Sequence, residues 1–178
     1  MNEESMVMKA VFTDMRALRT AAWLAKQGAV SVLRLARRDE VMEIVGTDSY
    51  VMLQAPVPCG FVDWPDGAVA VLESTFAAEA VCKVVGGSPD AWERPLTVCV
   101  ERGEGTYTVE FSRSGRTGVR RCCRFEGTKD KLGDLNEIER SMAEGTPEGH
   151  IKSYMWETVG QVVDRMHYTE WELVDHGR

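Results

Sequence analysis

Basic side chains at helical spacing are the first feature of this sequence that could take part in chemistry. The stretch 14–27 carries three basic residues and one acidic residue, a net charge of +2, in a chain whose formal net charge is -7. Its apolar residues recur at helical spacing and are Met15, Leu18, Ala22 and Ala25, and its polar side holds Arg16, Arg19, Thr20, Trp23, Lys26 and Gln27. We expect an amphipathic helix whose cationic face either contacts an acidic partner or is an ordinary solvated surface.

A second group of basic residues follows later in the chain. It consists of Arg113, Arg116, Arg120, Arg121 and Arg124. These residues are a second candidate basic patch for nucleic acid or an acidic partner, although alternating arginines also occur on the exposed side of a sheet.

Residues suited to catalysis form no recognised pattern. The histidines are His150, His167 and His176, without ligand or catalytic spacing, and the sequence holds no Walker loop, GxSxG or HExxH motif. Asp48 could join Glu43 in holding a metal, but an aspartate at a turn more often caps its own backbone. We therefore predict that the protein is not an enzyme and uses no cofactor and no metal.

Five cysteines, an odd number, show no zinc-ligand spacing. We expect most of them to be small buried side chains without disulfides. Cys122 and Cys123 would point to opposite faces of a strand.

Composition sets further bounds. A chain of 178 residues with 44% hydrophobic residues can bury one core of ordinary size. No apolar run reaches the ~20 residues of a membrane span, and the acidic N-terminus does not look like a signal peptide. We expect a cytoplasmic protein.

The residue pattern of the first half of the chain predicts five elements in the order strand, helix, strand, strand, strand. The expected elements are a strand over 7–12, the helix 14–27 between a capping Asp14 and Gly28, and strands over 29–35, 41–45 and 50–55. Turn formers occupy 46–49, and a connector rich in proline and glycine occupies 55–67.

The second half predicts the same order. The expected elements are a strand over 68–72, a helix over 75–85 capped by Ser74, and strands over 96–100, 107–111 and 119–125. Glu79 and Lys83 form an outward i,i+4 pair on this helix. The glycines at 103 and 105 predict a hairpin turn and not a phosphate-binding loop, since no helix follows them.

The repeated order predicts a duplicated β-α-β-β-β unit within one α+β domain, with both helices side by side on one face of antiparallel sheets. Several segments resemble one domain of a DNA sliding clamp of the bacterial DNA polymerase III beta-subunit type. They are VFTDMRALRTAAWLAK, VMEIVGTDSYVMLQAPVP and AVAVLESTFAAEAVCKVV, followed by DLNEIERSM and IKSYMWETVGQVVDRM. The proline usual beside the linker aspartate in that family is missing here.

The resemblance implies a division of the chain into three parts. These are a sliding-clamp-like domain over 1–126, a linker over 127–149 and a C-terminal strand and helix arm over 150–178. The apolar stripe of the last helix, Met155, Val159, Val162, Val163 and Met166, could pack on the first domain or in a dimer interface.

The resemblance also implies a function. Clamp helices line a ring of six domains around duplex DNA, and the positions that match their phosphate-facing cations are Arg16, Arg19, Lys26 and Lys83. Expected partners are double-stranded DNA, replication proteins and further copies of the chain, in replication or on a mobile element. The alternative is a protein-interaction or assembly module that keeps the fold without encircling DNA, and Trp23 could then pack against a neighbour or the C-terminal arm.

Overall fold

The computed structural model describes residues 6–85, 94–144 and 153–166, and of residues 116 and 117 it describes the backbone alone. The strands in these residues are β1 (Met6–Phe12), β2 (Val32–Arg38), β3 (Val41–Thr47), β4 (Met52–Phe61), β5 (Val69–Glu73), β6 (Leu96–Gly103), β7 (Thr106–Arg113) and β8 (Arg116–Arg124). The helices described are α1 (Arg16–Gln27), α2 (Ser74–Val85), α3 (Glu126–Glu144) and α4 (Ser153–Met166). Within these residues, no helix has the length and apolar character to cross a membrane.

All the strands form one antiparallel sheet with the order β5-β2-β3-β4-β1-β6-β7-β8. β1 pairs with β6 along its whole length but with β4 only over Ala10 to Phe12, so this short pairing joins the two halves. The sheet curls, and Arg121 on β8 reaches Glu73 at the end of β5, which links the two edge strands. The predicted α+β class with antiparallel strands is confirmed, and the duplication stays a prediction.

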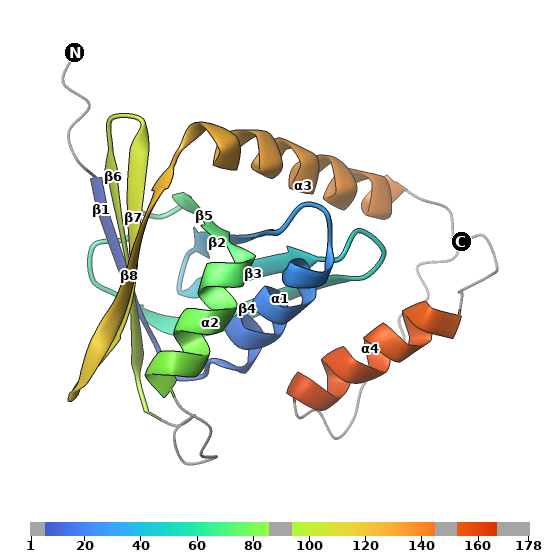
Figure 1. Ribbon diagram of the computed structural model, residues 1–178, viewed down its shortest axis with the longest axis horizontal. Helices are drawn as coiled ribbons and strands as arrows, with labels where there is room; N and C mark the ends of the chain where they lie inside the picture. The colour runs from blue at the N-terminus through green and yellow to red at the C-terminus, as the bar shows by residue number, and fades with distance from the viewer. Residues whose placement is uncertain (1–5, 86–93, 145–152, 167–178) are drawn as a thin grey trace.

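The main core lies between the sheet and two adjacent helices. α1 and α2 contact each other on the same face of the sheet, as expected (Figure 1). The predicted apolar stripe of α1 is fully buried, and Phe76 of α2 meets Phe111 of β7 edge to face at 5.7 Å. Thr20 is also fully buried, which corrects its assignment to the polar side, because α2 and α4 flank α1.

A second, smaller core lies on the opposite face of β2, β3 and β5. Successive residues of a strand point to opposite faces, so Leu33 enters the main core while Val32 enters the second one. Helix α3 covers this second core with Leu132, Leu135 and Ile138, of which Leu135 is fully buried.

Helix α3 occupies most of the segment expected to be a linker. Residues 127–149 are rich in charge, but Leu132, Leu135 and Ile138 recur every third position and supply one apolar stripe, which favours a helix once the sheet is there to cover. The division of the chain into domain, linker and arm stays a prediction.

Strand β4 extends through residues expected to be a connector. It continues to Phe61 although Pro56 and Pro58 lack a backbone N–H. β1 pairs with β4 only from Cys59 onward, so the preceding residues form an edge on that side, where a missing donor breaks no ladder. Ala55 and Val57 alternate with the exposed prolines and fill the core.

Candidate functional site

The cationic helix α1 begins beside an acidic side chain. Asp14 accepts a hydrogen bond from the backbone N–H of Arg16 at 2.9 Å, and Nε of Arg16 lies 3.0 and 2.9 Å from its two carboxylate oxygens. The side-chain hydrogen bond from Arg16 lowers the pKa of the Asp14 carboxyl and outweighs its burial. The N-cap position is Met15, one residue after the expected Asp14, although the Asp14 side chain still accepts a hydrogen bond from the N–H of the first helical residue. Arg16 therefore carries an acidic neighbour on the surface.

The middle of the same helix is covered by α4. The Arg165 guanidinium carbon lies 4.1 Å from the centroid of the Trp23 ring, a cation–π contact. Burial lowers the pKa of Arg165, and the nearby charge of Arg19 lowers it further. Arg19 and Trp23 are both half-buried. The position of Trp23 under the last described helix matches one of the two arrangements expected for it.

Helix α4 is held at both ends. Tyr154 meets Tyr50, in the turn between β3 and β4, edge to face at 5.6 Å, and Met166 joins the main core with 5% of its surface exposed. Val162 packs against the same core. Trp156 stays 43% exposed.

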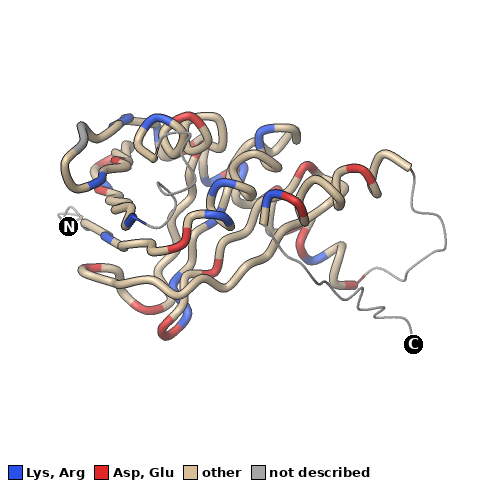
Figure 2. Tube along the Cα trace, turned by 90° about the horizontal axis from the view of Figure 1, so that it is seen from below, with Lys and Arg blue, Asp and Glu red and all other residues tan. Residues whose placement is uncertain are grey.

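The two remaining candidate cations lie near the ends of their helices. Lys26 is exposed in the last turn of α1, where a positive charge complements the helix dipole. Lys83, in the last turn of α2, lies 3.9 Å from Glu79, and both side chains are more than half exposed. Figure 2 shows basic and acidic positions interspersed along the chain. Asp14, just before α1, and Glu79 on α2 pair with two of the four candidate cations.

The second group of arginines is divided among different surroundings. Arg113 is buried and donates to the carbonyl of Val85 at 3.2 Å, so its assignment to an exposed patch is wrong. Arg120 pairs with Glu101 at 2.6 Å and Arg121 with Glu73 at 3.0 Å. Arg120 and Arg121 are consecutive in β8 and point to opposite faces. Arg124 is exposed, and the side chain of Arg116 lies outside the described residues.

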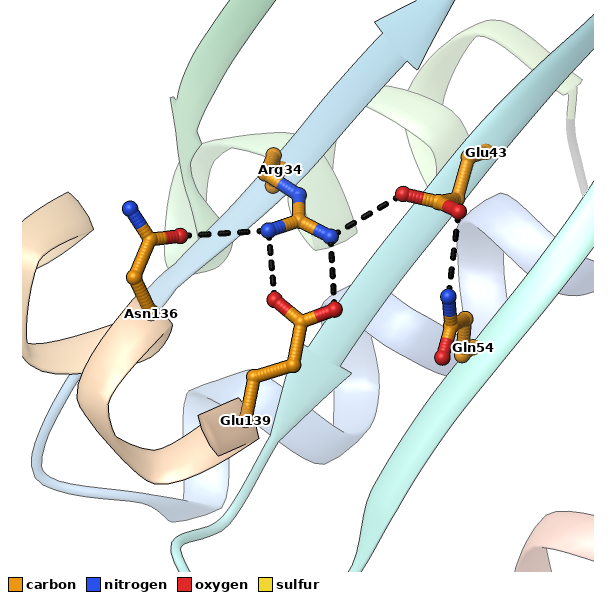
Figure 3. Close-up of polar contacts among 5 residues, drawn as sticks. All are labelled: Arg34, Glu43, Gln54, Asn136 and Glu139. Carbon is orange, nitrogen blue, oxygen red and sulfur yellow. Dashed lines mark hydrogen bonds and ion pairs between the residues drawn. The ribbon is translucent and has the colours of Figure 1, made fainter. Parts of the chain in front are cut away.

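Sequence reasoning missed a polar network beneath α3, drawn in Figure 3. Arg34 donates to both carboxylate oxygens of Glu139, at 2.5 and 3.0 Å, to Glu43 at 3.0 Å and to Asn136 at 3.1 Å. Gln54 donates to the second oxygen of Glu43 at 3.0 Å. Burial alone would lower the pKa of Arg34, but the two glutamates outweigh it and raise the pKa. The network fixes α3 to the sheet.

Asp48, a candidate metal ligand from the sequence, has a structural role. Asp48 accepts hydrogen bonds from the N–H groups of Tyr50 and Val51 at 2.8 and 2.7 Å, the turn-capping arrangement favoured for it. Glu43 is engaged by Arg34 and Gln54. Among the residues that the structure describes, no three His, Cys, Asp or Glu side chains gather as metal ligands. His150, His167 and His176 lie outside those residues.

All five cysteines are free thiols, but none is fully buried. Cys82 and Cys122 are exposed, which corrects the expectation that most would be core residues. Burial raises the pKa of the half-buried Cys59 thiol to about 11, so it is a weak nucleophile at neutral pH.

Comparisons with known proteins show a distant likeness to solved structures. No protein-family model matches the sequence. A search of curated proteins found no match. The matching solved structures include DNA polymerase III, beta chain, from Streptococcus pneumoniae TIGR4, with 15% identity and a TM-score of 0.45, over 65% of this chain and 30% of that chain. The chain thus spans less than a third of that protein, and a likeness at this TM-score carries no argument about family or function.

Proposed function

We propose that this protein is a non-enzymatic, sliding-clamp-like module that contacts the phosphate backbone of duplex DNA through the outward face of α1 and α2. The observation that carries the proposal is the position of Arg16, Arg19, Lys26 and Lys83 on two adjacent helices that share one face of the sheet. The sequence resemblance to a clamp domain supports the same face.

Such contacts are independent of DNA sequence. Guanidinium and ammonium groups bind phosphate oxygens and release condensed counterions, which makes the affinity fall steeply with salt. A single domain presents a short cationic surface, so the proposal includes association of several copies, with replication or a mobile element as the setting. The cytoplasm is the compartment that we propose for this role.

The test is fluorescence anisotropy with a 30-base-pair duplex at several salt concentrations. Four phosphate contacts predict a slope of log affinity against log salt of about -3 to -4. The double substitution Arg16→Glu and Arg19→Glu should weaken binding at every salt concentration and reduce the size of that slope by about two.

The matched control places the same charge change elsewhere. Arg38 at the end of β2 and Arg140 on α3 are both exposed and lie outside α1 and α2. The double substitution Arg38→Glu and Arg140→Glu should leave the slope unchanged. Equal losses in the two double variants, or no salt-dependent binding by the unaltered protein, would exclude this face as a DNA contact.

The second candidate function is a protein-interaction or assembly module that does not encircle DNA. The position of α4 favours this second function. That helix covers part of α1, and the exposed fractions of Tyr50, Tyr154 and Trp156 are 59%, 42% and 43%. Aromatic side chains are enriched at protein interfaces. The pairing of Arg16 with Asp14 and of Lys83 with Glu79 points the same way. Unchanged DNA retention in the Arg16→Glu, Arg19→Glu variant would favour this second function.

A further inference from the structure

A cavity of about 640 Å³ lies beside the first turn of α3. It is lined by Met6, Arg102, Gly103, Gly105, Phe125, Glu126 and Lys129. None of these residues belongs to α1, α2 or α4, so the cavity is separate from the proposed DNA contact. Its volume falls within the range of about 300–1,000 Å³ that is typical of sites for small molecules.

Two positive charges converge on one aromatic ring at this cavity. The guanidinium carbon of Arg102 lies 5.2 Å from the centroid of the Phe125 ring, and Nζ of Lys129 lies 4.4 Å from the same centroid. Arg102 comes from β6 and Lys129 from α3, and the ring belongs to the residue between β8 and α3. Long-range pairing of strands therefore brings the two cations together.

Neither cation has an acidic partner within residues 6–85, 94–144 and 153–166. Arg102 donates to the carbonyl of Val69, and burial lowers its pKa with no opposing contribution from a carboxylate. Glu126 also lines the cavity but forms no ion pair with either cation there. Arg34 gives the contrast, because two glutamates compensate its burial. A half-buried cation without a counter-ion is destabilising, and an anion in the cavity would supply the missing charge.

We propose that this cavity binds a small phosphorylated ligand, with its phosphate group between Arg102 and Lys129 and its less polar part against Met6 and Phe125. A phosphate offers several acceptor oxygens and two negative charges, and so matches two cationic donors on different elements. Gly103 and Gly105 line the same cavity without side chains that would fill it.

Isothermal titration calorimetry on the full chain tests the proposal, with inorganic phosphate and adenosine monophosphate as the two ligands at matched ionic strength in chloride. Both should bind with one site per chain. Equal affinities would assign recognition to the phosphate group, and tighter binding of the nucleotide would add the contact with Met6 and Phe125. Absence of binding by both ligands overturns the proposal.

Single substitutions locate the site. Lys129→Gln and Arg102→Gln should each reduce phosphate affinity about tenfold, the effect of losing one charge-assisted contact. Lys129 is exposed, so its variant tests the site even where Arg102→Gln disturbs the contact with Val69. The matched control is Arg140→Gln, an exposed cation on the same helix, which should bind phosphate normally. An equal loss in the control overturns the assignment.

The DNA proposal and this one can fail separately. The Arg16→Glu, Arg19→Glu variant should keep its affinity for phosphate, since neither residue lines the cavity. The Lys129→Gln variant should keep the salt dependence of DNA binding.

Discussion

At the scale of single residues, Arg34 shows how this protein keeps a charge inside. Its side chain is 10% exposed and donates to two glutamates from different elements. Hydrogen bonds from Nη1 and Nη2 offset the desolvation of the guanidinium, which otherwise costs several kcal/mol, whereas its Nε has no hydrogen-bond partner among the described residues. The ion pair between Arg34 and Glu139 therefore specifies where α3 lies. Arg34 adds stability only when both of its glutamate partners are present.

Glu139→Ala should lower the free energy of unfolding by about 2–3 kcal/mol, because it leaves two Arg34 donors beneath α3 without their carboxylate. Urea denaturation at fixed temperature measures this change. Glu137→Ala on the exposed side of the same helix is the matched control and should change stability by less than about 0.5 kcal/mol.

A triple variant separates the charge from the packing. Arg34→Met combined with Glu139→Leu and Glu43→Gln should be more stable than Glu139→Ala alone, because it removes the cation together with both carboxylates that pair with it and leaves no buried charge without a partner. If Glu139→Ala were as stable as Glu137→Ala, the network would have no structural role.

The sequence could not predict this network. Alternation in the stretch AVSVLRL predicts a half-buried strand and makes Arg34 look like one of its exposed positions. Its partner Glu139 lies 105 positions away, in a segment whose charge and glycine content favour a linker. Pairings over such a distance depend on the topology of the sheet, which local periodicity does not contain. For the same reason Arg113 could not be recognised as buried.

At the scale of elements, Gly46 determines how closely α1 can approach the sheet. The sequence around it, GTDS, predicts a turn, but Gly46 lies within β3 and faces the backbone of α1. A Cβ at this position would lie 2.6 Å from the carbonyl oxygen of Ala21, so a side chain would displace the helix backbone.

Gly46→Ala should destabilise the protein by about 1–3 kcal/mol, the usual cost of forcing extra volume into a packed interior. Thermal unfolding followed by circular dichroism measures it. Gly133→Ala is the control, because a Cβ there meets nothing within 4 Å in the middle of α3. That variant should gain about 0.5–1 kcal/mol from helix propensity, and a gain in both variants would contradict the close approach.

Local patterns predicted some elements well and others poorly. Apolar spacing identified α1, α2 and the buried strands, since each needs one face against the core. The prolines of β4 wrongly indicated a connector. A strand accepts proline where no neighbouring strand pairs with that side of its backbone, and the local sequence does not show that β1 pairs with β4 only from Cys59 onward. Of the candidate site, local spacing predicted the cations on α1 and α2 and the pairing of Lys83 with Glu79, but not the ion pair between Arg16 and Asp14.

At the scale of the whole molecule, α4 covers the middle of α1, which belongs to the proposed DNA contact. Arg165 stacks on Trp23 and lies close to Arg19, while Val162 and Met166 pack on the core. A duplex that reaches the middle of α1 must therefore displace α4.

Val162→Asp should raise the affinity for duplex DNA severalfold, because a charge in the contact loosens α4 and uncovers Arg19. Gln161→Asp adds the same charge on the exposed side of α4 and should leave the affinity unchanged or slightly lower. Anisotropy at one low salt concentration compares the two variants. Equal affinities of the two variants would mean that α4 does not restrict access of DNA to α1. If the unaltered protein bound no DNA at all, the DNA proposal itself would be refuted.

The covering of the second sheet face by α3 has a consequence for synthesis. The strands end at Arg124, whereas Leu132, Leu135 and Ile138 come later in the chain. On the ribosome, the sheet can therefore form while Val32, Val45 and Val71 are still uncovered and Arg34 has no Glu139 to meet. During that interval the nascent chain presents an apolar strip of the kind that chaperones bind. The strip is covered only after α3 has left the exit tunnel.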